Sequence, residues 1–346
     1  KKIMASGQHL LSLINDILDV SKIESGKVVL TVEEFTLNDL VSSVDAIIRP
    51  MAKAKGQKFH VEVTGVKYEY LMGDETRMNQ ILINLLSNAV KYTPEGGDIW
   101  FRIIGLKQHS SQYEHIRIEV EDNGYGMTPE YLTTIFDAFT RAENSTTNKV
   151  QGTGLGMAIT KNIVALMGGT IDVFSEVNKG SLFRVELEFR IPEKQADQQF
   201  WEQNGISRIL VISKEEQVDH NIHMLMQEVG VYVDIASGIE ETISQIKKSD
   251  RKEIYNIILV DWDMPDMDGI QVVEKIREYI SDNVYVLFMT AYGLDGMEKV
   301  LHLKNTGFLS KPFFVSALKE KILEIQEETL GEDNLPETES NNLEGL

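Results

Sequence analysis

The sequence predicts an α/β protein made of two different α/β domains and one additional helix at its N-terminus. Residues 206–326 alternate short apolar strands with amphipathic helices, which is typical of a five-stranded, doubly wound parallel sheet. Residues 27–192 mix strands and helices without this alternation and predict a separate sheet domain. Residues 1–26 carry apolar side chains at helical spacing. A polar linker over residues 193–205 and an acidic, disordered tail over residues 327–346 complete the predicted organisation.

Length and composition favour a multidomain globular protein. A chain of 346 residues is too long for one ordinary core. Its 34 Lys and Arg against 54 Asp and Glu give a net charge of -20, which opposes sequence-independent binding to nucleic acid or to an anionic membrane surface. Because the chain has no cysteine, disulfides and thiolate metal sites are excluded. No apolar stretch is long enough to span a bilayer, and the start at Lys1 within a helical pattern predicts a fragment of a longer protein.

The elements of the first large domain follow from apolar periodicity and helix caps. One helix is expected over residues 36–56, and a second over residues 73–97 with Asp74 as its N-cap. Strands are predicted at 28–35 and 59–63, and four further strands of one sheet at 99–106, 115–122, 169–177 and 181–189. A polar stretch over residues 123–154, rich in Gly, Asn and Thr, separates two of these strands. A loop of that length in a compact domain is usually functional.

The helix over residues 1–26 has too wide an apolar face to stand alone. Ile3, Leu10, Ile14 and Ile17 form a heptad-like seam, and Gly26 marks the end of the pattern. Such a face favours a helical bundle formed across a homodimer. Packing onto the following domain of the same chain is the alternative.

Polar side chains on the second predicted helix form the first part of a candidate ligand site. Asn84, Asn88 and Lys91 are spaced i, i+4 and i+7 and therefore share one helix face. Carboxamides on an otherwise core-facing helix are unusual unless they bind something. A carboxamide oxygen is a hard ligand, suited to a Mg²⁺ ion that also contacts the phosphates of a nucleotide.

Two Gly-rich segments of the polar stretch supply further parts of this site. In DNGYGM, residues 122–127, the Asp carboxylate at a strand end can accept a hydrogen bond from an exocyclic amine, and the glycines let the backbone approach a ligand. In GTGLGMAI, residues 152–159, three glycines precede a helix whose first N–H groups can hold phosphate. No GxxxxGK[ST] sequence occurs, so a P-loop is excluded, and GTGLG lacks the spacing of a dinucleotide-binding turn.

In this order, the Asn-bearing helix, DNGYGM, FDAFTR and GTGLGMAI resemble the N, G1, F and G2 boxes of the histidine-kinase ATP-binding domain. The resemblance covers residues 27–192 and implies an α/β sandwich that holds ATP and Mg²⁺ beneath a mobile lid. The opening helix is similar to the second helix of that family's dimerisation domain. The wider superfamily includes true ATPases, in which a Glu one turn before the Mg²⁺-binding Asn activates water. Asn84 takes that place here, and because a carboxamide cannot act as a general base, phosphoryl transfer is favoured over hydrolysis.

The resemblance implies a role for each site residue. Asn88 would bind Mg²⁺, and Asp122 would accept a hydrogen bond from the adenine amine. Contacts to the phosphates are expected from Asn84, Lys91 and Arg141. Phe136 and Phe139 would anchor the lid, with plain core packing as the alternative for both. The full ATP-binding set is Asn84, Asn88, Lys91, Tyr92, Asp122, Gly124, Gly126, Met127, Phe136, Phe139, Arg141, Gly152, Thr153, Gly154, Leu155 and Gly156, of which Asn84, Asn88 and Lys91 are the catalytic members.

The phosphoacceptor of that family, a His followed by Glu-x-x-Thr/Asn-Pro, is absent from this sequence. The histidines in other contexts are His9, His60, His109, His115, His220, His223 and His302. The fragment is therefore expected to bind ATP without phosphorylating itself, and to transfer the phosphoryl group to a His that lies outside it.

Residues 206–326 resemble a response-regulator receiver domain, which implies a flavodoxin-like fold and, after a kinase core, a hybrid histidine kinase. Asp261 ends the third predicted strand, is followed by MPDMDG and matches the phosphoacceptor position. Thr290 and Lys311 match the residues that bind the incoming phosphoryl oxygens, and Phe308 matches a switch aromatic. Taken alone, MPDMDG is also compatible with an ordinary turn.

The predicted receiver lacks the acidic pair with which the family ends its first strand. Ser213 and Lys214 stand at those positions, so Asp261 has too few oxygen neighbours for firm Mg²⁺ binding. Two arrangements are open: the Lys214 ammonium against Asp261, or Glu215 or Glu216 reaching back as a substitute metal ligand. Two hypotheses follow: a working receiver with unusual metal dependence, and a pseudo-receiver that takes no phosphate, which we favour.

The predicted function is the cytoplasmic, ATP-dependent protein-histidine kinase core of a two-component phosphorelay. Its expected downstream partner is a response regulator or phosphotransfer protein, and nucleic acid is not expected to bind. Membrane attachment is expected only through upstream segments. From a different class, the alternative is a non-catalytic signalling scaffold whose conformation is gated by nucleotide.

Overall fold

The computed structural model describes residues 29–140, 153–193, 198–248, 255–262, 269–291 and 304–332. The helix predicted over residues 1–26 lies outside the described residues, as do the site residues Arg141 and Gly152. The chain divides into two compact units. None of the described helices is both long and apolar enough to cross a bilayer.

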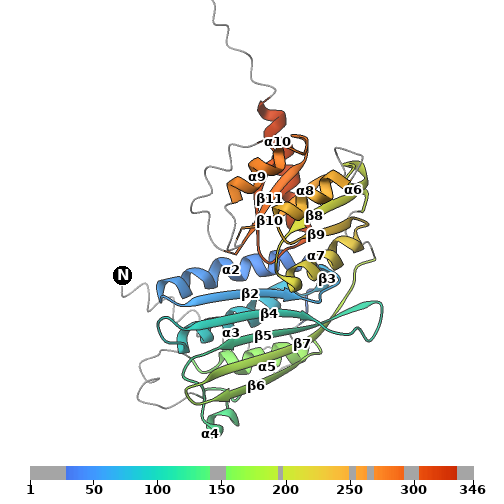
Figure 1. The fold of residues 1–346 in the computed structure, drawn as a ribbon. Coiled ribbons are helices and arrows are strands. Elements are labelled where there is room, and N and C mark those ends of the chain that lie inside the picture. Colours follow the sequence, from blue (N-terminus) through green and yellow to red (C-terminus); the bar gives the residue numbers. More distant parts are fainter. Residues whose placement is uncertain are drawn as a thin grey trace, which may run out of the picture. The chain divides into compact units, whose positions relative to one another are not determined.

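The first unit is built on a seven-stranded sheet with the order β1-β3-β7-β5-β4-β2, and β6 pairs with β7 beside this path (Figure 1). The strands are β1 Glu33–Thr36, β2 Lys58–Thr64, β3 Tyr70–Gly73, β4 Asp98–Gly105, β5 Tyr113–Asp122, β6 Thr170–Glu176 and β7 Gly180–Arg190. The strands β2 and β4 are parallel, and the other pairs are antiparallel. The strand predicted over residues 28–35 is wrong in its start, because β1 begins only at Glu33, and β3 was not predicted at all.

Four helices accompany this sheet: α2 Leu37–Ala54, α3 Glu75–Tyr92, α4 Pro129–Leu132 and α5 Gly156–Leu166. The predicted cap of α3 is confirmed, since the Asp74 carboxylate accepts a hydrogen bond of 3.0 Å from the Arg77 backbone N–H. The helix α3 contacts α2 on one side and α5 on the other. Its apolar stripe, which includes Ile81 and Leu85, is fully buried, so burial of this stripe fixes which face of α3 carries its polar side chains.

The strand β5 has two chemically different faces because side chains alternate along a strand. Ile116, Ile118, Val120 and Asp122 follow one another at intervals of two residues, so they share one face, and all four are buried. His115 lies on the opposite face, directly across from Glu188 of β7. The core-side face therefore delivers Asp122 to one end of the sheet, and the other face presents polar side chains.

The second unit contains a five-stranded parallel sheet with the order β12-β11-β10-β8-β9. Its strands are β8 Arg208–Ile212, β9 Tyr232–Ala236, β10 Ile257–Asp261, β11 Tyr285–Thr290 and β12 Thr306–Ser310. In chain order this is 2-1-3-4-5, the flavodoxin-like arrangement, and it confirms the predicted doubly wound sheet. The helices of this part of the chain are α7 Glu216–Glu228, α8 Ile239–Lys248, α9 Gly269–Arg277 and α10 Val315–Glu332. A helix predicted between the last two strands lies outside the described residues.

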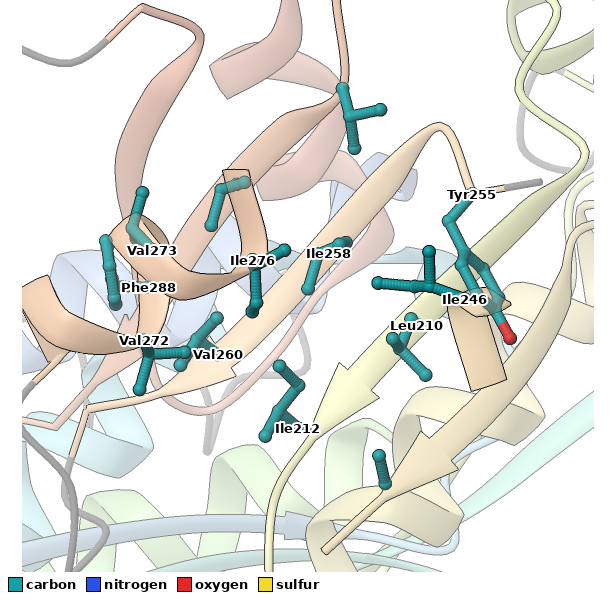
Figure 2. Packing of buried hydrophobic residues seen from close by; sticks show 13 residues of the cluster. Leu210, Ile212, Ile246, Tyr255, Ile258, Val260, Val272, Val273, Ile276 and Phe288 are labelled. Carbon is teal, nitrogen blue, oxygen red and sulfur yellow. The ribbon is translucent and has the colours of Figure 1, made fainter. Parts of the chain in front are cut away.

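Buried apolar side chains from the strands and helices form the core of the second unit. Figure 2 shows Ile212 of β8, Val260 of β10 and Phe288 of β11 together with Val272 and Ile276 of α9. The remaining members of the cluster are Leu210, Ala236, Ile246, Tyr255, Ile258, Val273, Val284 and Val286. This dry core fixes the ends of β8, β10 and β11 relative to one another, which is the edge where the candidate acceptor site lies.

Two predicted boundaries need correction. The segment predicted as a polar linker contains the helix α6 Gln198–Gln203, in which Trp201 is buried. The helix α10 continues to Glu332, past the predicted start of the disordered tail at residue 327. The polar composition of the linker hid the helix α6, because one buried aromatic side chain suffices to dock it.

Candidate functional site

The polar face of α3 meets the N-terminal end of α5. The Asn84 amide donates a hydrogen bond of 2.7 Å to the Thr160 hydroxyl, and the Asn88 amide lies 3.5 Å from the Met157 sulfur. With their N–H₂ groups turned toward α5, these carboxamides have their carbonyl oxygens available as acceptors. The two helices approach so closely that a Cβ added at Gly156 would lie 2.4 Å from Asn84 Oδ1.

The last turn of α3 adds a cation and an aromatic ring to this site. The Lys91 ammonium lies 5.0 Å from the centre of the Tyr92 ring, within the range of a cation–π contact. The Tyr92 carbonyl accepts a hydrogen bond of 3.2 Å from the Tyr125 backbone N–H. The end of α3 is thereby joined to the DNGYGM turn, and both Lys91 and Tyr92 remain partly exposed beside it.

Asp122 is a buried carboxylate at the end of β5. Its Oδ1 accepts a hydrogen bond of 2.8 Å from the Gly124 backbone N–H. Burial raises the pKa of Asp122 to about 6, and the backbone N–H groups of Gly124 and Ser181 oppose that rise in pKa. The side chain is only 7% exposed. A carboxylate kept in such a place without a cation beside it is suited to accept a hydrogen bond from a neutral donor, such as an exocyclic amine.

The glycines of the DNGYGM turn are required by backbone contacts. A Cβ at Gly124 would lie 2.5 Å from the Tyr92 carbonyl oxygen, and Gly126 has a φ of 64° with no room for a Cβ next to the Glu176 carbonyl. Met127 donates its backbone N–H to the Ser175 hydroxyl at 2.9 Å. The turn is therefore held between α3 and β6, as a rigid wall of the site.

A backbone contact joins Phe139 to Gly154, just before the helix α5. The Phe139 N–H donates to the Gly154 carbonyl at 3.0 Å, and both residues have positive φ values, 64° and 73°. Phe139 is 69% exposed, so the alternative of plain core packing is wrong for this residue. Phe136 is partly buried, and the Lys161 ammonium lies 5.3 Å from its ring centre.

The start of α5 has the properties of an anion site. Leu155 is its N-cap residue and makes no side-chain capping hydrogen bond. Its own N–H donates to the Thr153 hydroxyl at 3.2 Å. The N–H groups of the first helical turn, beginning with Gly156, lack partners within the helix and carry the positive end of the helix dipole. Phosphate oxygens fit this place, next to the carboxamides of α3.

The second unit brings the predicted acceptor residues together at one sheet edge. Asp261 ends β10 and is 4% exposed, and Thr290 ends β11 and is 8% exposed. The Lys311 ammonium lies 2.8 Å from Asp261 Oδ1 and 3.6 Å from Glu215 Oε1. The Lys311 backbone N–H donates to the Thr290 carbonyl at 2.8 Å. These contacts place all three predicted residues at one site.

An ammonium contact to the Asp261 carboxylate is made by Lys311. The contact considered above for Lys214 stays a prediction. Lys214 is exposed, whereas Ser213 is 2% exposed and accepts a hydrogen bond of 3.0 Å from the Glu215 N–H. Lys311 directly follows β12, where the hydrogen bond of its backbone N–H to the Thr290 carbonyl fixes its approach to Asp261. The Lys214 side chain, two residues after β8, is exposed.

Sequence reasoning missed Asp219 as a neighbour of this site. The carboxylate is 7% exposed and is hydrogen-bonded with Ser213. Burial, and then the nearby negative charges of Asp261 and Glu215, raise the pKa of Asp219. Its position three residues before the buried Ile222 places it on the inner face of α7, and that spacing was the signal available in the sequence.

Comparisons with known families assign a domain type to each of two segments of the chain. Residues 73–191 match the family described as histidine kinase-, DNA gyrase B- and HSP90-like ATPase, and residues 209–323 match the response regulator receiver domain. The chain has the domain composition of a hybrid sensor histidine kinase. The order of domains predicted from the four boxes and from the acceptor residues is thereby confirmed.

Three curated sensor and regulatory proteins are similar to most of this chain. The autoinducer 2 sensor kinase/phosphatase LuxQ of Vibrio cholerae is 30% identical over 92% of this chain and 37% of its own length. The sensory/regulatory protein RpfC of Xanthomonas campestris is 27% identical over 93% of this chain and 48% of its own. The aerobic respiration control sensor protein ArcB of Escherichia coli is 28% identical over 99% and 43%. The chain thus spans less than half the length of these relatives.

A solved structure supports the fold. Full-length ShkA in complex with AMPPNP is similar over 93% of this chain and 63% of that chain, with a TM-score of 0.54 and 23% identity. At this identity the similarity supports the arrangement of helices and strands, and residue roles have to be argued from the site itself.

Proposed function

We propose that this chain is the ATP-dependent protein-histidine kinase core of a two-component phosphorelay. In this proposal, Asn88 holds Mg²⁺ through its carboxamide oxygen, Asp122 accepts a hydrogen bond from the adenine amine, and the first turn of α5 binds phosphate. The γ-phosphoryl group goes to a His outside this sequence. A homodimer formed through residues 1–26 and a downstream response regulator or phosphotransfer protein complete the assembly, with attachment to a membrane only through upstream segments.

The observation that carries this proposal is the meeting of three complementary groups around one helix face. The carboxamides of Asn84 and Asn88 lie against the start of α5, and Asp122 lies buried beyond the end of α3. The carboxamide oxygens are hard ligands that suit Mg²⁺, and the N–H groups at the start of α5 suit phosphate. The buried Asp122 carboxylate suits a hydrogen-bond donor of the base. Mg²⁺ bound there would neutralise charge that develops on the transferred phosphoryl group.

The residue beside the proposed metal ligand favours phosphoryl transfer over ATP hydrolysis. Asn84, one helical turn before Asn88, has its amide engaged with Thr160 at 2.7 Å. A carboxamide takes no proton from water at neutral pH, so Asn84 cannot activate a hydrolytic nucleophile. It can orient phosphate oxygens while an external imidazole attacks.

Substituting Asn88 by Ala should abolish most of the transfer. Loss of the metal ligand is expected to reduce phosphoryl transfer to a separately supplied dimerisation domain by about 100-fold. The charge of the metal stabilises the transition state by several kcal/mol, and each loss of about 1.4 kcal/mol slows the reaction tenfold. Transfer is measured with γ-labelled ATP as acid-labile label on that domain. The chain alone should acquire no phosphohistidine.

The matched control is Asn79→Ala, the same change on the same helix but away from α5, where Asn79 contacts Ser43 instead. Its transfer rate should stay near that of the unsubstituted protein. Stoichiometric ATP binding without any transfer to the supplied His would support the non-catalytic scaffold and contradict the kinase.

We further propose that the receiver domain does not take phosphate in the usual way of its family. The residues at the end of β8 do not fit a Mg²⁺ site, because Ser213 is engaged with the Glu215 N–H and Lys214 has no oxygen ligand to offer. The Lys311 ammonium supplies positive charge at Asp261 in the absence of metal. Two carboxylates lie nearby, that of Asp219 in α7 and that of Glu215 just before α7. Neither stands at the positions of the acidic pair with which the family ends its first strand.

Beryllofluoride, a phosphoryl mimic, should therefore leave this receiver unchanged in the presence of Mg²⁺. Trp262 is the reporter, because its ring lies edge-on to Phe288 at 5.3 Å and to Phe308 at 5.9 Å. We expect no saturable change in its fluorescence. A saturable response that requires Mg²⁺ would contradict the proposal.

The double variant Ser213→Asp with Lys214→Asp tests the cause of this inactivity. It returns two carboxylates to the end of β8, and a Mg²⁺-dependent response of Trp262 to beryllofluoride should appear. Calorimetric titration with Mg²⁺ should show at least a tenfold gain in affinity. If the double variant binds no better, the missing pair does not explain the loss.

A further inference from the structure

Three side chains with metal-binding groups converge on the face of β5 and β7 that does not carry Asp122. They are His109 in the loop before β5, His115 in β5 and Glu188 in β7. Their ligand atoms all lie within 4.8 Å of one another. Among the described residues this is the one such group of three. It plays no part in the ATP site or in the receiver site.

His115 is the best-defined member of this group. Its side chain is 14% exposed, and its Nδ1 is buried without a hydrogen-bond partner in the described structure. Its Nε2 faces Glu186 Oε2 at 3.7 Å. A metal-binding imidazole usually binds the ion through one ring nitrogen and donates the N–H of the other to a carboxylate. His115 has this arrangement, with Nδ1 as the nitrogen left for a metal. A buried ring nitrogen left without any partner costs free energy, which a bound cation would remove.

The other two side chains are brought to His115 by the backbone. Glu188 is its direct neighbour across the β5–β7 ladder. The loop of His109 is fixed at both ends, since Leu106 donates its N–H to the His115 carbonyl at 2.8 Å and Tyr113 donates to the Ser110 carbonyl at 3.3 Å. His109 Nδ1 then lies 2.6 Å from Glu188 Oε1, and the two imidazole rings are 4.8 Å apart between centroids.

This group is remote from the nucleotide. Asp122 follows His115 by seven residues along β5, which separates them by about 23 Å at about 3.3 Å per residue. The two residues also project to opposite faces of the strand. A cation at His115 can therefore neither contact ATP nor replace the Mg²⁺ expected at Asn88.

The ligand set selects the class of metal. Two imidazoles and one carboxylate suit Zn²⁺ and similar divalent transition ions, whereas Mg²⁺ and Ca²⁺ prefer oxygen ligands only. We propose that His109, His115 and Glu188 form a Zn²⁺-class site that fastens the β4–β5 loop to the sheet, with Glu186 as the outer partner of His115. The alternative is a pair of His–carboxylate hydrogen bonds on a solvated sheet face with no metal.

Calorimetric titration of the untagged protein with Zn²⁺ in excess Mg²⁺ tests the proposal. We expect one Zn²⁺ per chain and at least a tenfold loss of affinity in both His115→Gln and Glu188→Gln. The control is His223→Gln, which removes an exposed imidazole of α7. Unchanged Zn²⁺ affinity in the two site variants, or an equal loss in the control, would overturn the site.

A second measurement separates metal binding from folding. Zn²⁺ should slow hydrogen exchange of the backbone in residues 106–113 of the unsubstituted protein, and this protection should be absent in Glu188→Gln, which keeps the size of the side chain. ATP affinity should be the same with and without Zn²⁺ in all variants. If Zn²⁺ protects this loop equally in Glu188→Gln, the carboxylate is not a ligand and the proposal fails.

Discussion

Replacing Asp122 by Asn is expected to weaken ATP binding and at the same time to stabilise the ATP-free domain at neutral pH. The two effects have one cause, which is the burial of the carboxylate. Burial moves its pKa from an ordinary value of 3.8 to about 6. At about 1.4 kcal/mol per pKa unit, this corresponds to a cost of about 3 kcal/mol for keeping the buried group charged.

The sign of the pH dependence follows from the raised pKa. Above pH 6 the carboxylate is charged in the folded and the unfolded protein, so the folded state carries the whole cost. As the pH falls below about 6 the folded protein takes up a proton first, and near 3.8 the cost is gone. The Asn variant should therefore gain about 1–2 kcal/mol at pH 7–8, less than the full cost because one backbone hydrogen bond is lost. The gain should shrink toward pH 4.

The loss of ATP affinity should be about 10- to 100-fold, since a hydrogen bond to a charged acceptor is worth about 1.5–3 kcal/mol. In the unsubstituted protein, ATP affinity should fall as the pH drops through about 6 and Asp122 is protonated. Calorimetry gives the affinity, and hydrogen exchange of β5 peptides gives the stability of this domain alone. The control is Asp172→Asn, an exposed carboxylate of β6. A variant that binds ATP normally would remove Asp122 from the site.

Replacing Lys311 by Met should destabilise the receiver domain by about 3 kcal/mol. The pair of Lys311 and Asp261 is buried, with side-chain exposures of 13% and 3%. Removal of one member of a buried ion pair leaves a charge without its counter-charge, which typically costs about 3–5 kcal/mol. Urea unfolding followed through Trp262, which packs on Phe288 in the same unit, measures the loss.

The double variant Lys311→Met with Asp261→Asn distinguishes charge from packing. It removes the buried Asp261 charge that Lys311 contacts, so most of the lost stability should return. Lys304→Met changes an exposed Lys at the start of the same strand region and should stay within about 0.5 kcal/mol of the unsubstituted protein. If the double variant is as unstable as Lys311→Met alone, the contribution of Lys311 is packing of its aliphatic chain.

Residue spacing and capping residues were sufficient to predict the helix α3 and the alternating strands and helices of the second unit. The α3 helix and its Asp74 cap follow from apolar spacing and from one side-chain hydrogen bond. The five-stranded parallel sheet of the second unit follows from the alternation of strands and helices, and its flavodoxin-like order was implied by the resemblance to a receiver domain. The strand β3 escaped prediction because it has only 4 residues and is held by neighbours far along the chain, Phe35 in β1 and Arg190 in β7 among them.

The parts of the sites that sequence could not supply depend on pairing across the fold. His109 and His115 read as ordinary loop and strand residues until the β5–β7 register sets Glu188 beside them. Lys311 was recognised by its place before Pro312, but its contact with both Asp261 and Glu215 depends on how β12 and the end of β8 meet the same edge. Which partner a long side chain such as that of Lys311 contacts depends on the packing of elements that are distant in the sequence.

The two faces of β5 have a consequence for how this strand can change in evolution. Residues of even number on it serve the helix-covered side, including Asp122, and residues of odd number such as His115 and Arg117 serve the other. Insertion or deletion of one residue between His115 and Asp122 would move every following side chain to the opposite face. Point substitutions on β5 can then be accepted one at a time, whereas a single-residue change in its length would expose the buried acceptor of the nucleotide site. Length variation in this domain should therefore accumulate in the loop before Tyr113 and not within the strand.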